Sequence, residues 1–181
     1  FTIETWFKRT GAGTPNTTGT SGIPNAIPLV THGAPEAEGG SVDANWVLVI
    51  DDTTDVIAAD FEDMATGLNH PILGTTPITE NVWHHAAVTY NGTFLYLYLD
   101  GHLENAAIHL NATPRFDSTQ LSGLGAMIKT DGTALGHFDG ALDEVRVWNY
   151  ARSQAQIQGT INSAVTFPQT GLVARWGLNE P

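Results

Sequence analysis

The sequence predicts an all-β fold in which two antiparallel sheets pack as a sandwich, with one short helix near residues 154–161. Short segments that alternate apolar and polar residues recur along the chain, and glycine, proline, asparagine and aspartate separate them. Asn91 and Gly92 lie between two such segments, and this pair supplies the positive φ angles of a tight hairpin turn. Many short strands with a single helix are typical of a sandwich or barrel.

The expected strands follow one another at intervals set by turn residues. They cover residues 1–7, 27–31, 46–50, 56–61, 83–90, 93–100, 142–148 and 172–178. Residues 10–22 are rich in glycine, threonine and proline and are expected to form a loop. Residues 51–55 are turn-forming, so the strands that flank them should form a hairpin. Ser153 and Gln156 have the spacing of a capping box, which predicts a helix of about two turns after Ser153.

Composition limits the classes of ligand. The 181 residues suffice for one sizeable core, so we expect a single domain over residues 1–181, cut from a larger polypeptide. Nineteen acidic and seven basic residues give a net charge of −12, which disfavours nucleic acid and anionic lipid and suits divalent cations or neutral ligands. There is no cysteine, so disulfides and zinc–cysteine sites are excluded. No apolar run approaches the ~20 residues of a membrane helix, so no membrane insertion is expected.

Four segments, taken in order, resemble the laminin-G-like jelly-roll domains of the concanavalin A-like lectin and glucanase superfamily, which are related to pentraxins. The segments cover residues 1–7, 83–101, 138–153 and 171–180 and so reach from end to end of the chain. The resemblance implies a jelly roll with one concave sheet. It also implies a secreted or cell-surface protein, of bacterial or archaeal type, with neighbouring domains in the same polypeptide.

Carboxylates are the main candidates for metal ligands. Asp60, Glu62 and Asp63, with Asn69 shortly after, bring several oxygen donors to the end of one strand and its loop, as calcium requires. Asp60 and Glu62 are two residues apart and should share a face of the strand. The alternative is a solvated acidic loop. We expect calcium to be a cofactor of the protein, and we make that prediction ahead of the choice between this location and a second one at Asp143.

Asp143 is a separate candidate for calcium. It alternates with Val145 and Val147, so its side chain is expected to face the core, where a carboxylate needs a cation or hydrogen bonds. The resemblance implies that an aspartate in this kind of strand holds a structural calcium ion. The alternative is an aspartate that accepts hydrogen bonds from backbone amides at a sheet edge.

Aromatic residues offer a possible binding surface. Phe94, Tyr96 and Tyr98 alternate with leucines and should share one face, where they would form a platform for a sugar or else pack in the core. His84 and His85 are adjacent and should face opposite sides of a strand, so they cannot chelate one metal together. We expect His85 to be a structural residue of the sheet.

The function expected from these features is a non-catalytic extracellular module that binds calcium and attaches to a glycan or a protein surface. No string of alternating catalytic acids and no nucleophile motif occurs, so no catalytic residue is assigned. One alternative is a glycan-cleaving enzyme that uses Glu62 with Glu144 or His70. Another is a structural spacer without a ligand.

Overall fold

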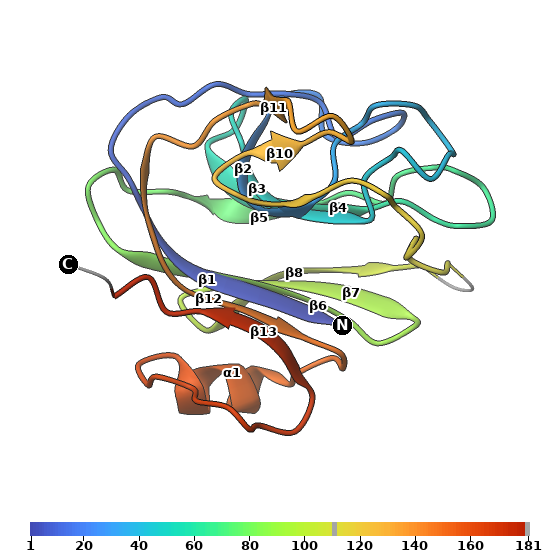
Figure 1. Cartoon of the computed structure of the whole chain (residues 1–181). Helices are drawn as coiled ribbons and strands as arrows, with labels where there is room; N and C mark the ends of the chain where they lie inside the picture. The colour runs from blue at the N-terminus through green and yellow to red at the C-terminus, as the bar shows by residue number, and fades with distance from the viewer. Residues whose placement is uncertain (110–111, 180–181) are drawn as a thin grey trace.

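The computed structural model describes residues 1–109 and 112–179 and confirms the predicted sandwich of two antiparallel sheets (Figure 1). One sheet has the strand order β13-β12-β1-β6-β7-β8. Its strands are β1 (Thr2–Arg9), β6 (His84–Tyr90), β7 (Phe94–Leu99), β8 (His102–Ile108), β12 (Gly140–Trp148) and β13 (Leu172–Trp176). The other sheet has the order β5-β4-β3-β2-β9. Its strands are β2 (Ala26–His32), β3 (Trp46–Asp51), β4 (Val56–Phe61), β5 (Ile72–Pro77) and β9 (Ser122–Leu124).

The main core lies between the two sheets. Phe7 of β1, Leu48 of β3 and Leu97 of β7 are fully buried there, because alternate residues of each strand point inward. Both outer faces of the sandwich are also partly covered. Residues 10–22 and the two-stranded ribbon of β10 (Met127–Ile128) and β11 (Ala134–Leu135) lie over the five-stranded sheet (Figure 1), where Met127 joins a second buried apolar cluster.

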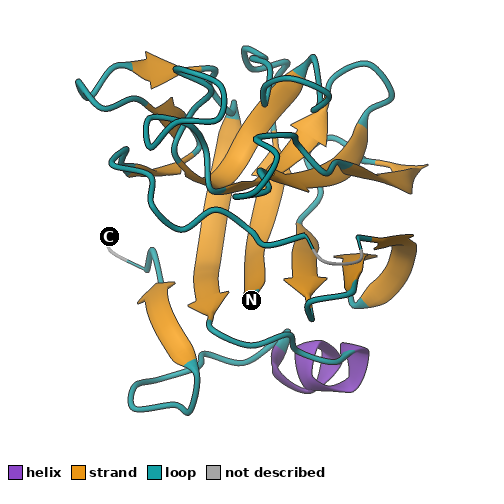
Figure 2. Cartoon of the chain, turned by 90° about the vertical axis from the view of Figure 1, so that its right-hand side faces the viewer, coloured by secondary structure: helices purple, strands orange, loops and turns teal. Residues whose placement is uncertain are grey.

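The predicted helix is confirmed as α1 (Gln154–Thr160), which lies under the six-stranded sheet (Figure 2). The Ser153 hydroxyl accepts a hydrogen bond from the Gln156 amide, and the Gln156 side chain accepts one from the Ser153 amide, so the capping box forms. Ile157 packs against Ala87 and Tyr98 on the sheet. Within the described residues, no helix is long and apolar enough to cross a membrane.

The two predicted hairpins form as β3–β4 and β6–β7. At the second turn, the Asn91 side-chain oxygen accepts hydrogen bonds from the amides of Thr93 and Phe94 (2.9 and 2.8 Å). The strands β5, β8, β9, β10 and β11 were not predicted from the sequence.

The strands β5 and β8 belong to different sheets but meet along one side of the sandwich. The Glu104 carboxylate of β8 accepts hydrogen bonds from the backbone amides of Thr75 and Thr76 in β5, each at 2.8 Å. Asn105 also donates to the carbonyl of Leu73 (2.8 Å). Side chains of one sheet therefore bind the backbone of the other along this side.

Candidate functional site

Asp60 and Glu62 point away from the main core, into the loops over the five-stranded sheet, as their spacing predicts. Asp60 is buried, and its two oxygens accept hydrogen bonds from the Thr18 hydroxyl (2.6 Å) and the His70 amide (2.8 Å). Burial raises the pKa of Asp60 to about 8, and the hydrogen bonds only partly oppose that shift. At neutral pH this carboxyl is therefore mostly protonated.

Glu62 lies beside Asp43, a second buried carboxylate that the sequence analysis did not single out. The Nε of Arg115 lies 2.8 Å from the Oε1 of Glu62. Among the described residues, neither oxygen of Glu62 accepts a hydrogen bond of standard geometry. Burial, together with Asp43, raises the pKa of Glu62 to about 9. Asp43, Asp60, Glu62 and Arg115 are called the acid cluster below.

Asp63 and Asn69 lie nearby, but their side chains hold loops in place. Asp63 accepts hydrogen bonds from the Thr113 amide and from the Thr66 hydroxyl (2.8 Å each). Burial would raise the pKa of Asp63, but these bonds outweigh it and lower the pKa below its usual value. Asn69 donates to the Thr20 carbonyl (3.2 Å). In the described parts of the chain, no three histidine or acidic side chains are arranged to hold a metal ion.

Asp143 lies in the other sheet, and its expected orientation toward the core is wrong. A β-bulge interrupts the pairing of β12 with β1: Leu142 pairs with Phe7 on the core side, and Asp143 pairs with Trp6 on the outer side. Glu144, within the bulge, has a φ of 48°. Because the bulge shifts the alternation by one residue, Val145 returns to the core and Asp143 does not. The calcium role of Asp143 stays a prediction.

The predicted aromatic row lies on the outer face of the six-stranded sheet, with Leu95, Leu97 and Leu99 on the core side as expected. Phe94 stacks on Tyr96 with ring centres 5.6 Å apart. Tyr98 is largely buried against Ile157 of α1, but with Tyr96 it also lines an open pocket of about 340 Å³. A ligand-binding role for Phe94, Tyr96 and Tyr98 stays a prediction.

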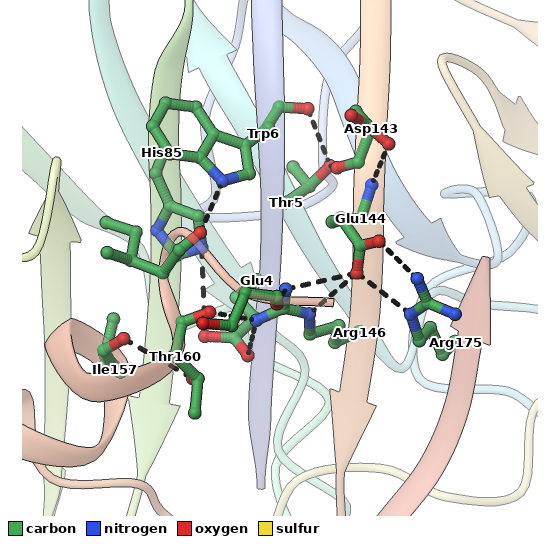
Figure 3. Close-up of polar contacts among 12 residues, drawn as sticks. Glu4, Thr5, Trp6, His85, Asp143, Glu144, Arg146, Ile157, Thr160 and Arg175 are labelled. Atoms are coloured by element: carbon green, nitrogen blue, oxygen red, sulfur yellow. Dashed lines mark hydrogen bonds and ion pairs between the residues drawn. The ribbon is translucent and has the colours of Figure 1, made fainter. Parts of the chain in front are cut away.

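A buried ionic network occupies the middle of the same outer face, between the sheet and α1 (Figure 3). The Oε1 of Glu4 accepts hydrogen bonds from Arg152 (2.6 Å) and from the Trp148 indole (3.0 Å), and Arg146 lies 3.6 Å away. Glu4 and Arg146 are both fully buried. His85 is buried beside them, and burial, with the two guanidinium groups, lowers its pKa to about 3. His85 is thus a neutral residue packed within the sheet.

Glu144 connects this network to the last strand. Its carboxylate accepts hydrogen bonds from Arg146 of β12 (3.1 Å) and from Arg175 of β13 (2.9 Å, with a second, shorter contact) (Figure 3). Burial acts to raise the pKa of Glu144, but the two arginines outweigh it and lower the pKa. β13 is therefore fixed to β12 by an ion pair as well as by backbone hydrogen bonds.

An open groove of about 450 Å³ lies between the two sheets, on the side where β13 and β9 are the edge strands. Phe116 and Trp176 in its walls are 74% and 39% exposed. Trp46 also lines the groove and stacks on His32, with ring centres 5.9 Å apart. The groove is also lined by Phe1, Asn45, Ser122 and Val173. Exposed aromatic side chains around a concave surface indicate a ligand site.

The acid cluster fixes one wall of this groove. Arg115 donates its backbone amide to the Glu62 carbonyl (2.8 Å) and its side chain to the Gly39 carbonyl (2.9 Å), in addition to the ion pair with Glu62. The next residue, Phe116, is thereby held with its ring in solvent at the groove. Sequence spacing could not reveal this site, because Phe1, Trp46, Phe116 and Trp176 come from four distant segments.

A family model described as the Concanavalin A-like lectin/glucanases superfamily matches residues 1–158. A search of curated proteins finds no match. Among solved structures, a "putative carbohydrate binding protein" from Bacteroides ovatus superposes with a TM-score of 0.66 at 19% identity, over 97% of this chain and 44% of that one. The chain thus spans less than half of that protein.

Two further structures show the same fold. The CBM40 of the Ruminococcus gnavus IT-sialidase, bound to α2,3 sialyllactose, has a TM-score of 0.64 at 13% identity and covers 87% of this chain and 80% of its own. A heptameric SAP-like pentraxin from Limulus polyphemus has a TM-score of 0.56 at 15% identity, over 90% of this chain and 70% of its own. With the two-sheet topology and the match over residues 1–158, these findings show that the chain belongs to the concanavalin A-like lectin/glucanases superfamily, as a laminin-G-like jelly-roll domain.

Proposed function

We propose that the protein is a non-catalytic, extracellular glycan-binding module and that the groove between β13 and β9 is its binding site. The observation that carries this proposal is the exposure of Phe116 and Trp176 at a concave surface. Sugars dock their C–H faces on aromatic rings, and hydroxyls bind polar groups at the rim. His32, Asn45 and Ser122 are placed to supply such groups.

The charges around the groove favour a neutral glycan. Arg115 is the basic residue in the lining, and its guanidinium is already paired with Glu62 and Asp117. The chain as a whole carries a net charge of −12, which disfavours the approach of an anionic ligand. One structural neighbour is described as a putative carbohydrate binding protein and another is bound to sialyllactose, which supports a glycan as the ligand; because sialyllactose is acidic, the preference for a neutral glycan rests on the charges of this chain alone.

The positions of the candidate acids argue against the glycan-cleaving alternative. Two carboxylates that cleave a glycosidic bond must face one cleft about 5–9 Å apart. Glu62 lies under the loops of the five-stranded sheet, and Glu144 lies on the outer face of the other sheet, held by two arginines. His70 is partly buried and stacks against Phe61. Neither predicted pair therefore faces a shared cleft.

Replacing Phe116 with alanine should weaken glycan binding about tenfold or more, because an exposed aromatic contact at the centre of a site contributes roughly 1–2 kcal/mol. The matched control is Phe167→Ala, since Phe167 is also exposed (56%) and does not line the groove. A glycan array followed by calorimetry on the best oligosaccharide measures the effect. If Phe116→Ala and Phe167→Ala weakened glycan binding equally, the groove would not be the binding site. No binding to any glycan would favour the spacer alternative, and released reducing sugar would favour the enzyme.

We also propose that calcium binds at the acid cluster. The fit rests on the adjacent buried carboxylates of Glu62 and Asp43. Among the described residues, Oε2 of Glu62 accepts no hydrogen bond, while Oε1 is paired with Arg115. Asp43 accepts hydrogen bonds from the amides of Gly39 and Ala44. These two carboxylates would hold the ion, with carbonyls and water completing its oxygen ligands. Asp60, Asp63 and Asn69 already have protein partners. Bound calcium would displace the proton from Glu62, connect its carboxylate to that of Asp43 and so stabilise the loop that carries Phe116.

Millimolar calcium should therefore raise the thermal unfolding midpoint relative to a chelator. An ion at a hundredfold excess over its Kd contributes ~2.7 kcal/mol, or roughly 5–10 °C for a chain of this size. Glu62→Gln should reduce the response, and Glu80→Gln, at an exposed turn, should retain it. Differential scanning calorimetry measures both. A midpoint that does not change between calcium and chelator would contradict the proposal.

A further inference from the structure

A second pocket of about 380 Å³ lies on the outer face of the six-stranded sheet, beside the C-terminal end of α1. Two tryptophans line it: Trp83, which is 41% exposed, and Trp6 of β1. Its polar lining includes Asp143, Asn162 and Ser163. It shares no lining residue with the groove, so the two can be occupied at the same time.

The bulge in β12 is what brings a carboxylate to this pocket. Without it, Asp143 would alternate into the core; with it, Asp143 lies opposite Trp6 on the outer face. One oxygen, Oδ1, accepts the Glu144 amide at 2.8 Å (Figure 3). Among the described residues, Oδ2 accepts no hydrogen bond and remains available to a ligand. Bulges that redirect a side chain, and non-glycine residues with positive φ, are concentrated at functional sites.

The walls of the pocket are held in place before any ligand binds. The Trp6 indole donates to the Ile161 carbonyl (2.8 Å) and contacts His85 edge to face (Figure 3). The Lys8 ammonium lies 5.4 Å from the centre of the Trp83 ring, within the range of a cation–π contact. A site with fixed side chains loses less conformational entropy when a ligand binds.

The charges beneath the pocket balance. Glu4, Asp143 and Glu144 carry three negative charges, and the guanidinium groups of Arg146, Arg152 and Arg175 carry three positive charges. The network itself therefore carries no net charge, and Lys8 against Trp83 adds a single positive charge at the rim of the pocket. Indole rings beside an acceptor carboxylate and an amide suit a neutral ligand with several hydroxyl groups.

We propose that the pocket formed by Trp6, Trp83 and Asp143 is a second binding site for a neutral glycan, in which Oδ2 of Asp143 accepts sugar hydroxyls and Trp83 contacts the sugar face. The inference rests on the proposed function for its ligand class, but the site is separate from the groove. Two weak sites on one module would raise affinity for a polysaccharide surface by avidity, typically 10²–10⁴-fold where both engage.

The five tryptophans allow both sites to be followed in one experiment. Trp46 and Trp176 report on the groove, Trp6 and Trp83 on the second pocket, and buried Trp148 serves as the internal control. Indole N–H resonances of the ¹⁵N-labelled full chain are recorded during titration with cellohexaose, xylohexaose and maltohexaose at millimolar concentrations. We expect the Trp6 and Trp83 signals to shift with at least one oligosaccharide, while Trp148 does not.

Asp143→Asn provides the decisive variant, because it keeps the side-chain shape and an oxygen for the Glu144 amide. It should weaken the response of Trp6 and Trp83 about tenfold and leave that of Trp46 and Trp176 unchanged. Asp131→Asn, at an exposed turn, is the matched control and should alter neither. Shifts confined to Trp46 and Trp176, or an unchanged affinity of Asp143→Asn, would overturn the second site alone. Shifts confined to Trp6 and Trp83 would contradict the groove, and no shift at any indole would contradict both.

Discussion

Replacing Glu4 with glutamine is expected to lower the free energy of unfolding by about 3–5 kcal/mol. Glu4 is fully buried, and its carboxylate is the partner of Arg152 at 2.6 Å and lies 3.6 Å from Arg146. Glutamine keeps the size of the side chain but removes its charge, so buried Arg152 would lose the carboxylate paired with it, and Arg146 would keep only its ion pair with Glu144. Removing one partner of a buried ion pair costs this much because the remaining charge stays desolvated.

Urea unfolding, monitored by tryptophan fluorescence, measures this loss. Glu80→Gln is the matched control, since Glu80 is exposed, and it should change stability by less than about 0.5 kcal/mol. A loss of similar, small size in both variants would show that the network between the sheet and α1 contributes little. Because Glu4 lies away from the groove, glycan affinity of the groove should be retained in the folded Glu4→Gln protein.

Raising the pH from about 7 to about 9 in the presence of a chelator is expected to destabilise the protein by roughly 2 kcal/mol, most of it from Asp60. The pKa values of Asp60 and Glu62 are raised to about 8 and about 9, far above those of the unfolded chain. The folded state therefore keeps protons that the unfolded state has already lost. The stability that these two raised pKa values contribute is fully present at pH values below the pKa values of the unfolded chain. It is lost as the pH rises through the folded-state pKa values of about 8 and about 9.

Glu62→Gln separates this effect from other titrations. Glutamine cannot ionise, so the variant should lose less stability over the same interval and should be more stable than the parent protein at about pH 9. Asp63 and Glu144 have lowered pKa values, so their contributions are lost only at acidic pH, outside this interval. Urea midpoints at several pH values, with Glu80→Gln as control, provide the measurement. If the urea midpoints of Glu62→Gln and of the parent protein fell in parallel as the pH rises, the raised pKa of Glu62 would be contradicted.

Local sequence signals predicted those parts of the fold that depend on neighbouring residues. The Asn91–Gly92 turn and the Ser153 capping box each determine a structure within a few residues, and both form as expected. The period of two likewise placed Asp60 and Glu62 on one face. Strand β5 was missed because Gly74, Thr75 and Pro77 resemble a loop, and β8 because its mostly polar, exposed residues show no apolar alternation.

Other features depend on contacts that sequence spacing does not encode. The bulge at Glu144 is stabilised by Arg175, 31 residues later, so the alternation around Asp143 misled the prediction of its direction. Asp43 joins Glu62 because a long loop folds over the five-stranded sheet. The groove likewise exists only once β13 is placed at the sheet edge, which brings Trp176 to the same opening as Phe116.

Glu104 has a consequence for how copies of the protein behave at high concentration. Unpaired amides on an edge strand can template the addition of a strand from another molecule. The amides of Thr75 and Thr76 in β5 are instead satisfied by the Glu104 carboxylate from the opposite sheet. Intermolecular pairing at this edge would first require the two sheets to separate locally. At high concentration the protein is thus protected against self-association along the β5 side, while the β13 side stays accessible.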